Sequence, residues 1–278
     1  MNRKLIKIYI LIFISYVAVS INLPNVFPKS YKVFNNFRLK VETRVKSEKV
    51  AAFPVTEGKI NLMFIMDDGW ETQYTVGYNL LKKYGIKANI SVIPSLVGEN
   101  EYMTLDQLSD MYINGWDMLN HTYNHYYLND LNLKQKIKEF NKGRKWLVFH
   151  EFTRAKDDVV FPGGYYNKNT IDVLKSNNYK SARSLGEVWN ISSEVKESNV
   201  DIINLDSSVE ALWAMDSIND ALDKKRDIIF VLHKLEKVTT NTGMQYDPQR
   251  LEEILNYINA KREKVNVVTY SQWLNIRY

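Results

Sequence analysis

Apolar runs and amphipathic segments alternate along the chain from about residue 56 to its end. Short runs rich in apolar residues predict β-strands at 59–66, 86–93, 116–120, 159–161, 179–183, 202–205, 227–232 and 265–269. Between them, apolar residues recur at helical spacing and predict helices at 74–84, 104–115, 132–147, 170–177, 218–225, 247–263 and 271–276. Strand and helix therefore alternate about seven times, which is typical of a parallel sheet and favours closure into an α/β fold of the (β/α) barrel type.

Two of these helices begin with specific start signals. Thr104 and Gln107 have the spacing of a capping box, in which each side chain bonds the backbone N–H of the other. Asp247 stands directly before Pro248, which predicts an N-cap followed by proline at the first helical position.

The N-terminal segment has the pattern of an export signal. Basic residues at positions 3, 4 and 7 precede a nearly unbroken apolar run over 8–21. This run is short for a membrane span, so residues 1–23 are predicted to be a signal peptide or a retained signal anchor. Residues 24–55 carry scattered prolines and many basic residues, which indicates a linker or stalk before a catalytic domain over 56–278. The predicted location is extracellular or on the cell surface.

Composition narrows the chemistry. The chain has no cysteine, so any metal must be held by His, Asp or Glu. Its net charge of +5 is mild and scattered, with no basic stripe interleaved with aromatic residues, and this argues against nucleic acid as a partner.

Chemically active residues gather at the ends of the predicted strands. Asp67 and Asp68 follow the first strand, His121 and His125 follow the third, and His233 follows the strand at 227–232. Active sites of parallel barrels lie at these carboxyl ends. Two histidines and one carboxylate with open positions form a metal site, and the neighbouring carboxylate can then handle protons.

Each of these signals has a structural alternative. An isolated His-x-x-x-His pair is weak evidence for a metal, and Asp-Gly is also a common hairpin turn, although a helical pattern follows it here. His233 alone is also compatible with a buried, hydrogen-bonded histidine. His150, the remaining one of four histidines, matches no strand end and is predicted to be structural.

The ordered motifs Asp-Asp-Gly (67–69), His-Thr-x-x-His (121–125), Pro-Gly-Gly (162–164) and Leu-His (232–233) resemble the NodB-type polysaccharide deacetylases, carbohydrate esterase family 4. The similarity extends from about residue 60 to the C-terminus and includes segments 80–88 and 267–270. The resemblance implies the NodB-homology fold, a distorted (β/α) barrel of about seven strands that is either complete or incomplete.

The resemblance also implies roles for individual residues. Asp67 would be the general base and His233 the general acid. The metal ligands would be Asp68, His121 and His125, with Thr122 bracing their loop. The substrate groove would be lined by Pro162, Gly163 and Gly164, and the apolar wall of the acetyl pocket would be formed by Leu232. The implied cofactor is a divalent metal, most often Zn²⁺, with Co²⁺ or Ni²⁺ as alternatives.

Two of the departures from the family pattern concern the candidate site. Many members carry an arginine two residues before the motif proline, where it orients the base, but this chain has Val160 there. Arg183, at another predicted strand end, is a candidate substitute. The family segment whose aspartate orients the catalytic histidine has no clean match, and Asp206 and Asp216 are the candidates.

The implied function is an exported metal-dependent deacetylase that hydrolyses N-acetyl groups of an N-acetylhexosamine polymer, either peptidoglycan or an exopolysaccharide. The alternative is a non-catalytic cell-surface carbohydrate-binding protein with a degenerate deacetylase site. Presence of the full set of metal ligands together with Asp67 and His233 favours the enzyme. Besides the polysaccharide, the only expected contact is with a membrane, through an uncleaved N-terminal anchor.

Overall fold

The computed structural model describes residues 58–238 and 243–277. The predicted signal segment (1–23) and linker (24–55) lie outside the described residues. Among the helices that are described, none combines the length and the apolar character needed to cross a bilayer.

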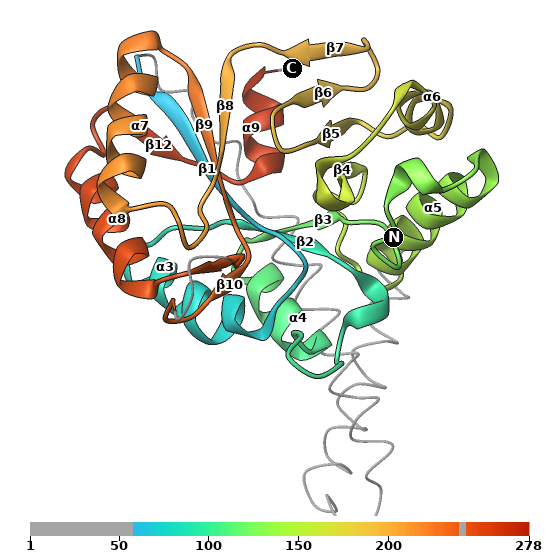
Figure 1. Cartoon of the computed structure of the whole chain (residues 1–278), viewed down its shortest axis with the longest axis horizontal. Helices are drawn as coiled ribbons and strands as arrows, with labels where there is room; N and C mark the ends of the chain where they lie inside the picture. The colour runs from blue at the N-terminus through green and yellow to red at the C-terminus, as the bar shows by residue number, and fades with distance from the viewer. Residues whose placement is uncertain (1–57, 239–242, 278) are drawn as a thin grey trace, which may run out of the picture. The chain divides into compact units, whose positions relative to one another are not determined.

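A mostly parallel sheet of ten strands forms the centre of the described residues (Figure 1). Its order is β7-β6-β5-β4-β3-β2-β1-β9-β8, with β12 also paired to β1. The parallel strands are β1 (Ile60–Met66), β2 (Asn89–Val92), β3 (Asp117–Asn120), β4 (Asp158–Val160), β5 (Ser181–Arg183), β8 (Val200–Asn204), β9 (Asp227–Leu232) and β12 (Val265–Val267). Two antiparallel strands, β6 (Val188–Asn190) and β7 (Val195–Glu197), extend one end of the sheet.

The barrel is incomplete. Within the described residues, β8 and β7 end the sheet and do not pair with each other. Trp273 of helix α9 (Tyr270–Arg277) instead packs in one apolar cluster with Val200 of β8 and Val188 of β6. Helix α9 therefore fills the space between the two ends of the sheet, and the predicted distorted, incomplete α/β barrel is confirmed.

Alternate residues of the central strands face two different apolar clusters, because successive side chains of a strand point to opposite faces. Phe64 of β1 and Phe230 of β9 belong to a large cluster that includes residues of the covering helices. Ile65 of β1 and Val231 of β9 belong to the smaller inner cluster with Trp273. This alternation decides which residues at the strand ends are directed towards the inside of the barrel.

The helices connect the strands and cover the sheet (Figure 1). They are the π-helix η1 (Gln73–Tyr78), α3 (Asn79–Lys83), α4 (Leu105–Ile113), α5 (Leu133–Phe149), α6 (Lys168–Ser176), α7 (Ala211–Lys224) and α8 (Pro248–Ala260). Both predicted start signals are confirmed. Thr104 and Gln107 form the full capping box of α4, and the Asp247 side chain accepts a hydrogen bond from the N–H of Gln249 at 2.8 Å.

The structure differs from the sequence-based expectation in three places. Helix α7 begins at Ala211, well before the predicted start at 218, because the small side chains of Ala211 and Ala214 extend its buried face. Strands β6 and β7 have three residues each, which is too short to show an alternating pattern. The two-residue strands β10 (Lys234–Leu235) and β11 (Gln245–Tyr246) were not expected for the same reason.

A buried carboxylate at the amino end of β9 anchors helix α9. Asp227, the first residue of β9, accepts hydrogen bonds from the indole N–H of Trp273 at 2.7 Å and from the guanidinium of Arg277 at 2.8 Å. Its other oxygen accepts the backbone N–H of Asn61 at 2.8 Å. These contacts lie at the amino end of β9, opposite the carboxyl edge of the strands where the candidate site residues lie.

Candidate active site

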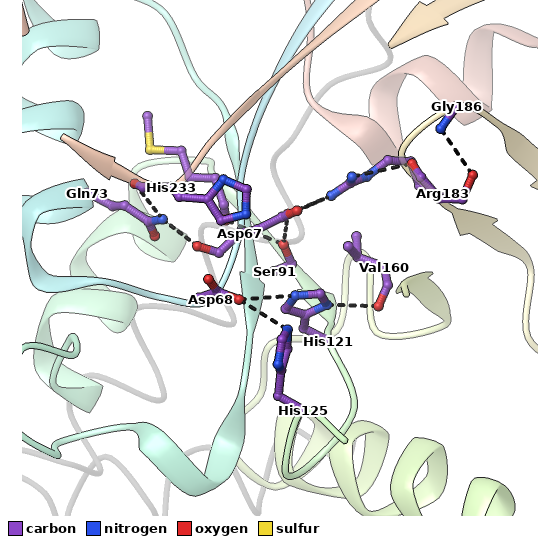
Figure 2. A network of polar contacts seen from close by, with 12 residues as sticks. Asp67, Asp68, Gln73, Ser91, His121, His125, Val160, Arg183, Gly186 and His233 are labelled. Carbon is purple, nitrogen blue, oxygen red and sulfur yellow. Dashed lines mark hydrogen bonds and ion pairs between the residues drawn. The ribbon is translucent and has the colours of Figure 1, made fainter. Parts of the chain in front are cut away.

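The carboxyl edge of the sheet brings the candidate residues together (Figure 2). Because β1, β3, β4, β5 and β9 run in one direction, the segments that leave them meet at this edge. Asp67 and Asp68 follow β1, His121 and His125 follow β3, and His233 follows β9. These side chains therefore lie close together in the structure, as the sequence predicts.

Three of these side chains form a group that can hold a cation. The Nε2 atoms of His121 and His125 each lie 3.3 Å from Oδ1 of Asp68. All three ligand atoms lie within 4.8 Å of one another. One carboxylate and two imidazoles match the ligand set of catalytic zinc sites, in which further coordination positions stay open.

The hydrogen bonds and protonation of this group fit a metal as well. Nδ1 of His121 lies 2.8 Å from the backbone oxygen of Val160, to which it donates, so Nε2 faces Asp68. Burial would lower the pKa of His121, but the hydrogen bond to Asp68 and the charges of Asp67 and Asp68 outweigh it and raise that pKa, so a bound cation would take the place of the Nε2 proton. Burial, with His121 alongside, lowers the pKa of His125 to about 4, which keeps that imidazole neutral. Neutral histidines and an ionised carboxylate are the forms that bind a divalent cation.

Asp67 points away from this group towards Arg183 of β5 (Figure 2). The guanidinium Nη2 lies 2.6 Å from Oδ1 and 2.5 Å from Oδ2 of Asp67, and the Ser91 hydroxyl donates to Oδ1. Burial would raise the pKa of Asp67, but the Arg183 charge and the nearby histidines outweigh it and hold that pKa below its ordinary value. Arg183 thus contacts Asp67, as expected of a residue that replaces the arginine missing at position 160.

Gln73, the first residue of the π-helix, links the two strand ends that carry Asp67 and His233. Its Nε2 donates to the backbone oxygens of Asp67, at 2.5 Å, and of His233, at 3.1 Å. No motif or spacing in the sequence singles out Gln73 or Ser91. Each is a polar residue inside an otherwise apolar segment, and that is the signal that could have marked them.

His233 lies beside Asp67 in Figure 2 and is 9% exposed. Its Nδ1 is buried and has no hydrogen-bond partner among the described residues. The carboxylate of Asp206, one candidate for orienting it, accepts hydrogen bonds from Ser208 and Asn204 instead. Asp216, the other candidate, is exposed on α7. Neither aspartate therefore makes the orienting hydrogen bond that the family pattern predicts.

The Pro-Gly-Gly motif follows β4 at the carboxyl edge of the sheet. Gly163 and Gly164 both have positive φ, at 61° and 74°, a conformation that favours glycine. A Cβ at Gly164 would lie 2.6 Å from Cγ of Leu185. Pro162 itself is buried, whereas Tyr127 and Tyr165 next to the glycines are more than half exposed. The motif therefore lies beside two exposed aromatic rings, and its expected role in lining a groove stays a prediction.

The predicted role of Leu232 as a pocket wall is wrong. Its side chain is fully buried and belongs to the cluster between the sheet and the outer helices, on the opposite face from the site. Val231, one residue earlier, faces the inner cluster with Ile65. Because strand side chains alternate, Val231 and His233 share a face and Leu232 does not.

Thr122 and His150 lie where the sequence places them. The Thr122 hydroxyl accepts the backbone N–H of His125 at 3.1 Å and so braces the loop that carries both histidines. His150 is the C-cap of α5, with its ring 4.3 Å from that of Trp146, and is a packing residue.

Comparisons with known proteins agree with the fold and the motifs. The sequence model of a family described as polysaccharide deacetylase matches residues 54–182. The protein YxkH of Bacillus subtilis (strain 168), a polysaccharide deacetylase by prediction, is 31% identical over 121 residues, covering 43% of this chain and 42% of that protein. A poly-β-1,6-N-acetyl-D-glucosamine N-deacetylase of Staphylococcus aureus (strain MRSA252) is 31% identical over 154 residues, covering 50% of this chain and 51% of that protein.

The chain therefore spans about half the length of the curated relatives it matches. Among solved structures, a family 4 acetyl xylan esterase from Clostridium thermocellum, in complex with a cobalt ion, has a TM-score of 0.55 at 16% identity. The alignment covers 78% of this chain and 91% of that one, which shows a shared fold.

Proposed function

Because the chain belongs to the NodB-type polysaccharide deacetylase family, we propose that it is an exported, metal-dependent hydrolase of N-acetyl groups on an N-acetylhexosamine polymer. One observation supports this proposal most. Two adjacent carboxylates have different partners, since Asp68 lies between two imidazoles and Asp67 pairs with a guanidinium. This separation suits a metal ligand next to a general base.

The cation would be held by Asp68, His121 and His125, with Zn²⁺ as the first candidate and Co²⁺ or Ni²⁺ as alternatives. When bound, such an ion polarises a carbonyl and lowers the pKa of water. Neighbouring residues hold these ligands in place. Val160 fixes the tautomer of His121 through its backbone oxygen, and Thr122 holds the backbone of His125.

Asp67 would accept the proton of the attacking water. It stays ionised because Arg183 and the histidines hold its pKa low, and it is 4% exposed, so bulk water does not compete for it. The contact of Arg183 Nη2 with both carboxylate oxygens also fixes their direction. A base that is ionised and held in place can act at neutral pH.

His233, when protonated, would give a proton to the leaving nitrogen. In the overall step the water oxygen bonds to the acetyl carbon and the C–N bond breaks. The water proton goes to Asp67, and the proton of His233 goes to the amine. Gln73 ties the backbones of Asp67 and His233 together, so the acceptor and the donor keep a constant separation.

The substrate class follows from the relatives rather than from the site. The Staphylococcus aureus relative is named for poly-β-1,6-N-acetyl-D-glucosamine, so this exopolysaccharide is the first polymer to test, with peptidoglycan second. The exposed rings of Tyr127 and Tyr165, which lie beside Gly163, suit the flat faces of sugar rings in either polymer.

Acetate release tests the activity. The full chain is expected to release acetate from poly-β-1,6-N-acetylglucosamine or peptidoglycan with added zinc, and to lose this release with a chelator. Zinc added back should restore it, which controls for irreversible unfolding. A folded chain that binds zinc and releases no acetate from either polymer would contradict the proposal and favour the non-catalytic carbohydrate-binding protein.

Export is proposed from the basic and apolar pattern of residues 1–23. Residues 1–57 fused to bacterial alkaline phosphatase, which is active only outside the cytoplasm, are expected to give phosphatase-positive cells. Changing Ile12 and Ile14 to aspartate should abolish the signal, since charges interrupt the apolar run. Equal phosphatase activity with and without those charges would contradict export through this segment.

A further inference from the structure

Helix α5 carries a carboxylate on its buried face. The residues of that face are Lys136, Glu139, Phe140, Gly143 and Leu147. Glu139 is only 5% exposed. Burial of a carboxylate is costly unless hydrogen-bond donors or cations compensate it, so the position of Glu139 needs a specific explanation.

The partners of Glu139 belong to the loop that carries the candidate metal ligands. Its Oε2 accepts the backbone N–H groups of Tyr123, at 3.2 Å, and of Asn124, at 2.8 Å. Its Oε1 accepts Nδ2 of the Asn124 side chain at 2.7 Å. Tyr123 and Asn124 lie between His121 and His125, so one side chain of α5 holds the centre of the His-x-x-x-His segment.

This loop has a conformation that needs outside support. Thr122 and His125 both have positive φ, at 62° and 60°, which is unfavourable for residues with a Cβ and most of all for a β-branched one. The hydroxyl contact from Thr122 to His125 supports the loop only from within. The carboxylate of Glu139 supplies the matching support from a neighbouring helix.

Two further contacts fix α5 against the start of the same loop. Asn120 donates to the backbone oxygen of Phe140 at 3.0 Å and accepts the N–H of Thr122 at 3.0 Å. A Cβ at Gly143 would lie 2.3 Å from Oδ1 of Asn120, so glycine is required for this approach. Helix and loop are therefore packed closely enough for Glu139 to reach the loop amides.

We propose that Glu139 is a positioning residue for the metal site, which holds the His121–His125 loop in its ligand-presenting conformation before a cation binds. The inference rests on the proposed function only in requiring that a cation binds at Asp68, His121 and His125. Without the carboxylate, the loop would sample other conformations, and binding would have to reorder it. Partners of this kind typically change metal affinity by about 10- to 100-fold.

The test measures zinc affinity of the full chain by competition with a chromophoric chelator, which does not depend on catalysis. In Glu139→Gln, one carboxylate oxygen is replaced by an NH₂ group. This NH₂ group then faces a donor, which is either the loop N–H groups or the NH₂ group of Asn124. Zinc affinity is expected to fall about 10- to 100-fold. The double variant Asn124→Asp with Glu139→Gln reverses donor and acceptor while keeping the net charge, and it should recover most of the affinity.

A matched control separates this role from helix stability. Asn132 caps the other end of α5, where its side chain accepts the N–H of Gln135 at 3.0 Å. Asn132→Ala should lower Tm through the lost cap and leave zinc affinity within about twofold of wild type. Equal weakening in Asn132→Ala and Glu139→Gln would overturn the inference, as would unchanged affinity in Glu139→Gln. A wild-type chain that binds no zinc would overturn the proposed function as well.

Discussion

Replacing Asp67 by asparagine is expected to lower kcat for acetate release about a thousandfold while leaving zinc affinity within a few-fold of wild type. The amide keeps the size of the side chain but cannot accept the proton of the attacking water. The proposed metal ligands are untouched, because Asp67 is directed towards Arg183 and Ser91 rather than towards the two histidines. Steady-state kinetics and a chelator-competition titration measure the two quantities on the same preparation.

Two other aspartates serve as controls for this change. Asp68→Asn should lose zinc affinity and activity together, since Asp68 is the carboxylate between the imidazoles. Asp216→Asn should change neither, because Asp216 is exposed on α7. If Asp67→Asn lost zinc as severely as Asp68→Asn, the two carboxylates would not have separate roles.

Replacing Arg183 by glutamine is expected to destabilise the protein by about 3 kcal/mol and to reduce activity strongly, because it leaves the buried Asp67 carboxylate without its cation. Burial then raises the pKa of Asp67, whereas in the wild type Arg183 opposes that effect. A base must be ionised to act, so the acidic limb of the pH–rate profile should move to higher pH. Urea denaturation and a pH series of kcat/KM measure the two effects.

The double variant Asp67→Asn with Arg183→Gln distinguishes stability from catalysis. It removes both buried charges, so more than half of the stability lost in Arg183→Gln should return, while activity should stay at the level of Asp67→Asn. If the stability losses of the two single variants instead add up in the double variant, the loss in Arg183→Gln does not come from breaking the buried ion pair between Asp67 and Arg183.

The sequence predicted the strand ends and their chemistry because those features are local. An apolar run that ends in Asp67-Asp68 or in His233 can be seen without the fold, and parallel strands bring such ends to one edge. The hypothesis that Arg183 replaces the missing arginine at Val160 relied on the same reasoning. The structure places its guanidinium on Asp67 from the neighbouring strand.

The residues that sequence reasoning missed act through tertiary packing. Ser91, Gln73 and Glu139 make their contacts across 24, 160 and 15 or 16 positions of sequence, and none lies in a recognisable motif. Leu232 was assigned to the pocket because it precedes His233 in the motif. Because side chains alternate along the strand, Val231 rather than Leu232 lies on the same face as His233. The motif alone does not show this alternation.

A zinc-edge anomalous difference map from a zinc-soaked crystal tests most directly whether Asp68 binds the metal and Asp67 does not. One peak is expected, at about 2.0–2.2 Å from Asp68 Oδ1 and from Nε2 of both His121 and His125. Asp67 should remain paired with Arg183 and outside the coordination sphere. A peak coordinated by Asp67, or no peak among these three residues, would contradict the assignment of Asp68 as the metal ligand and Asp67 as the base.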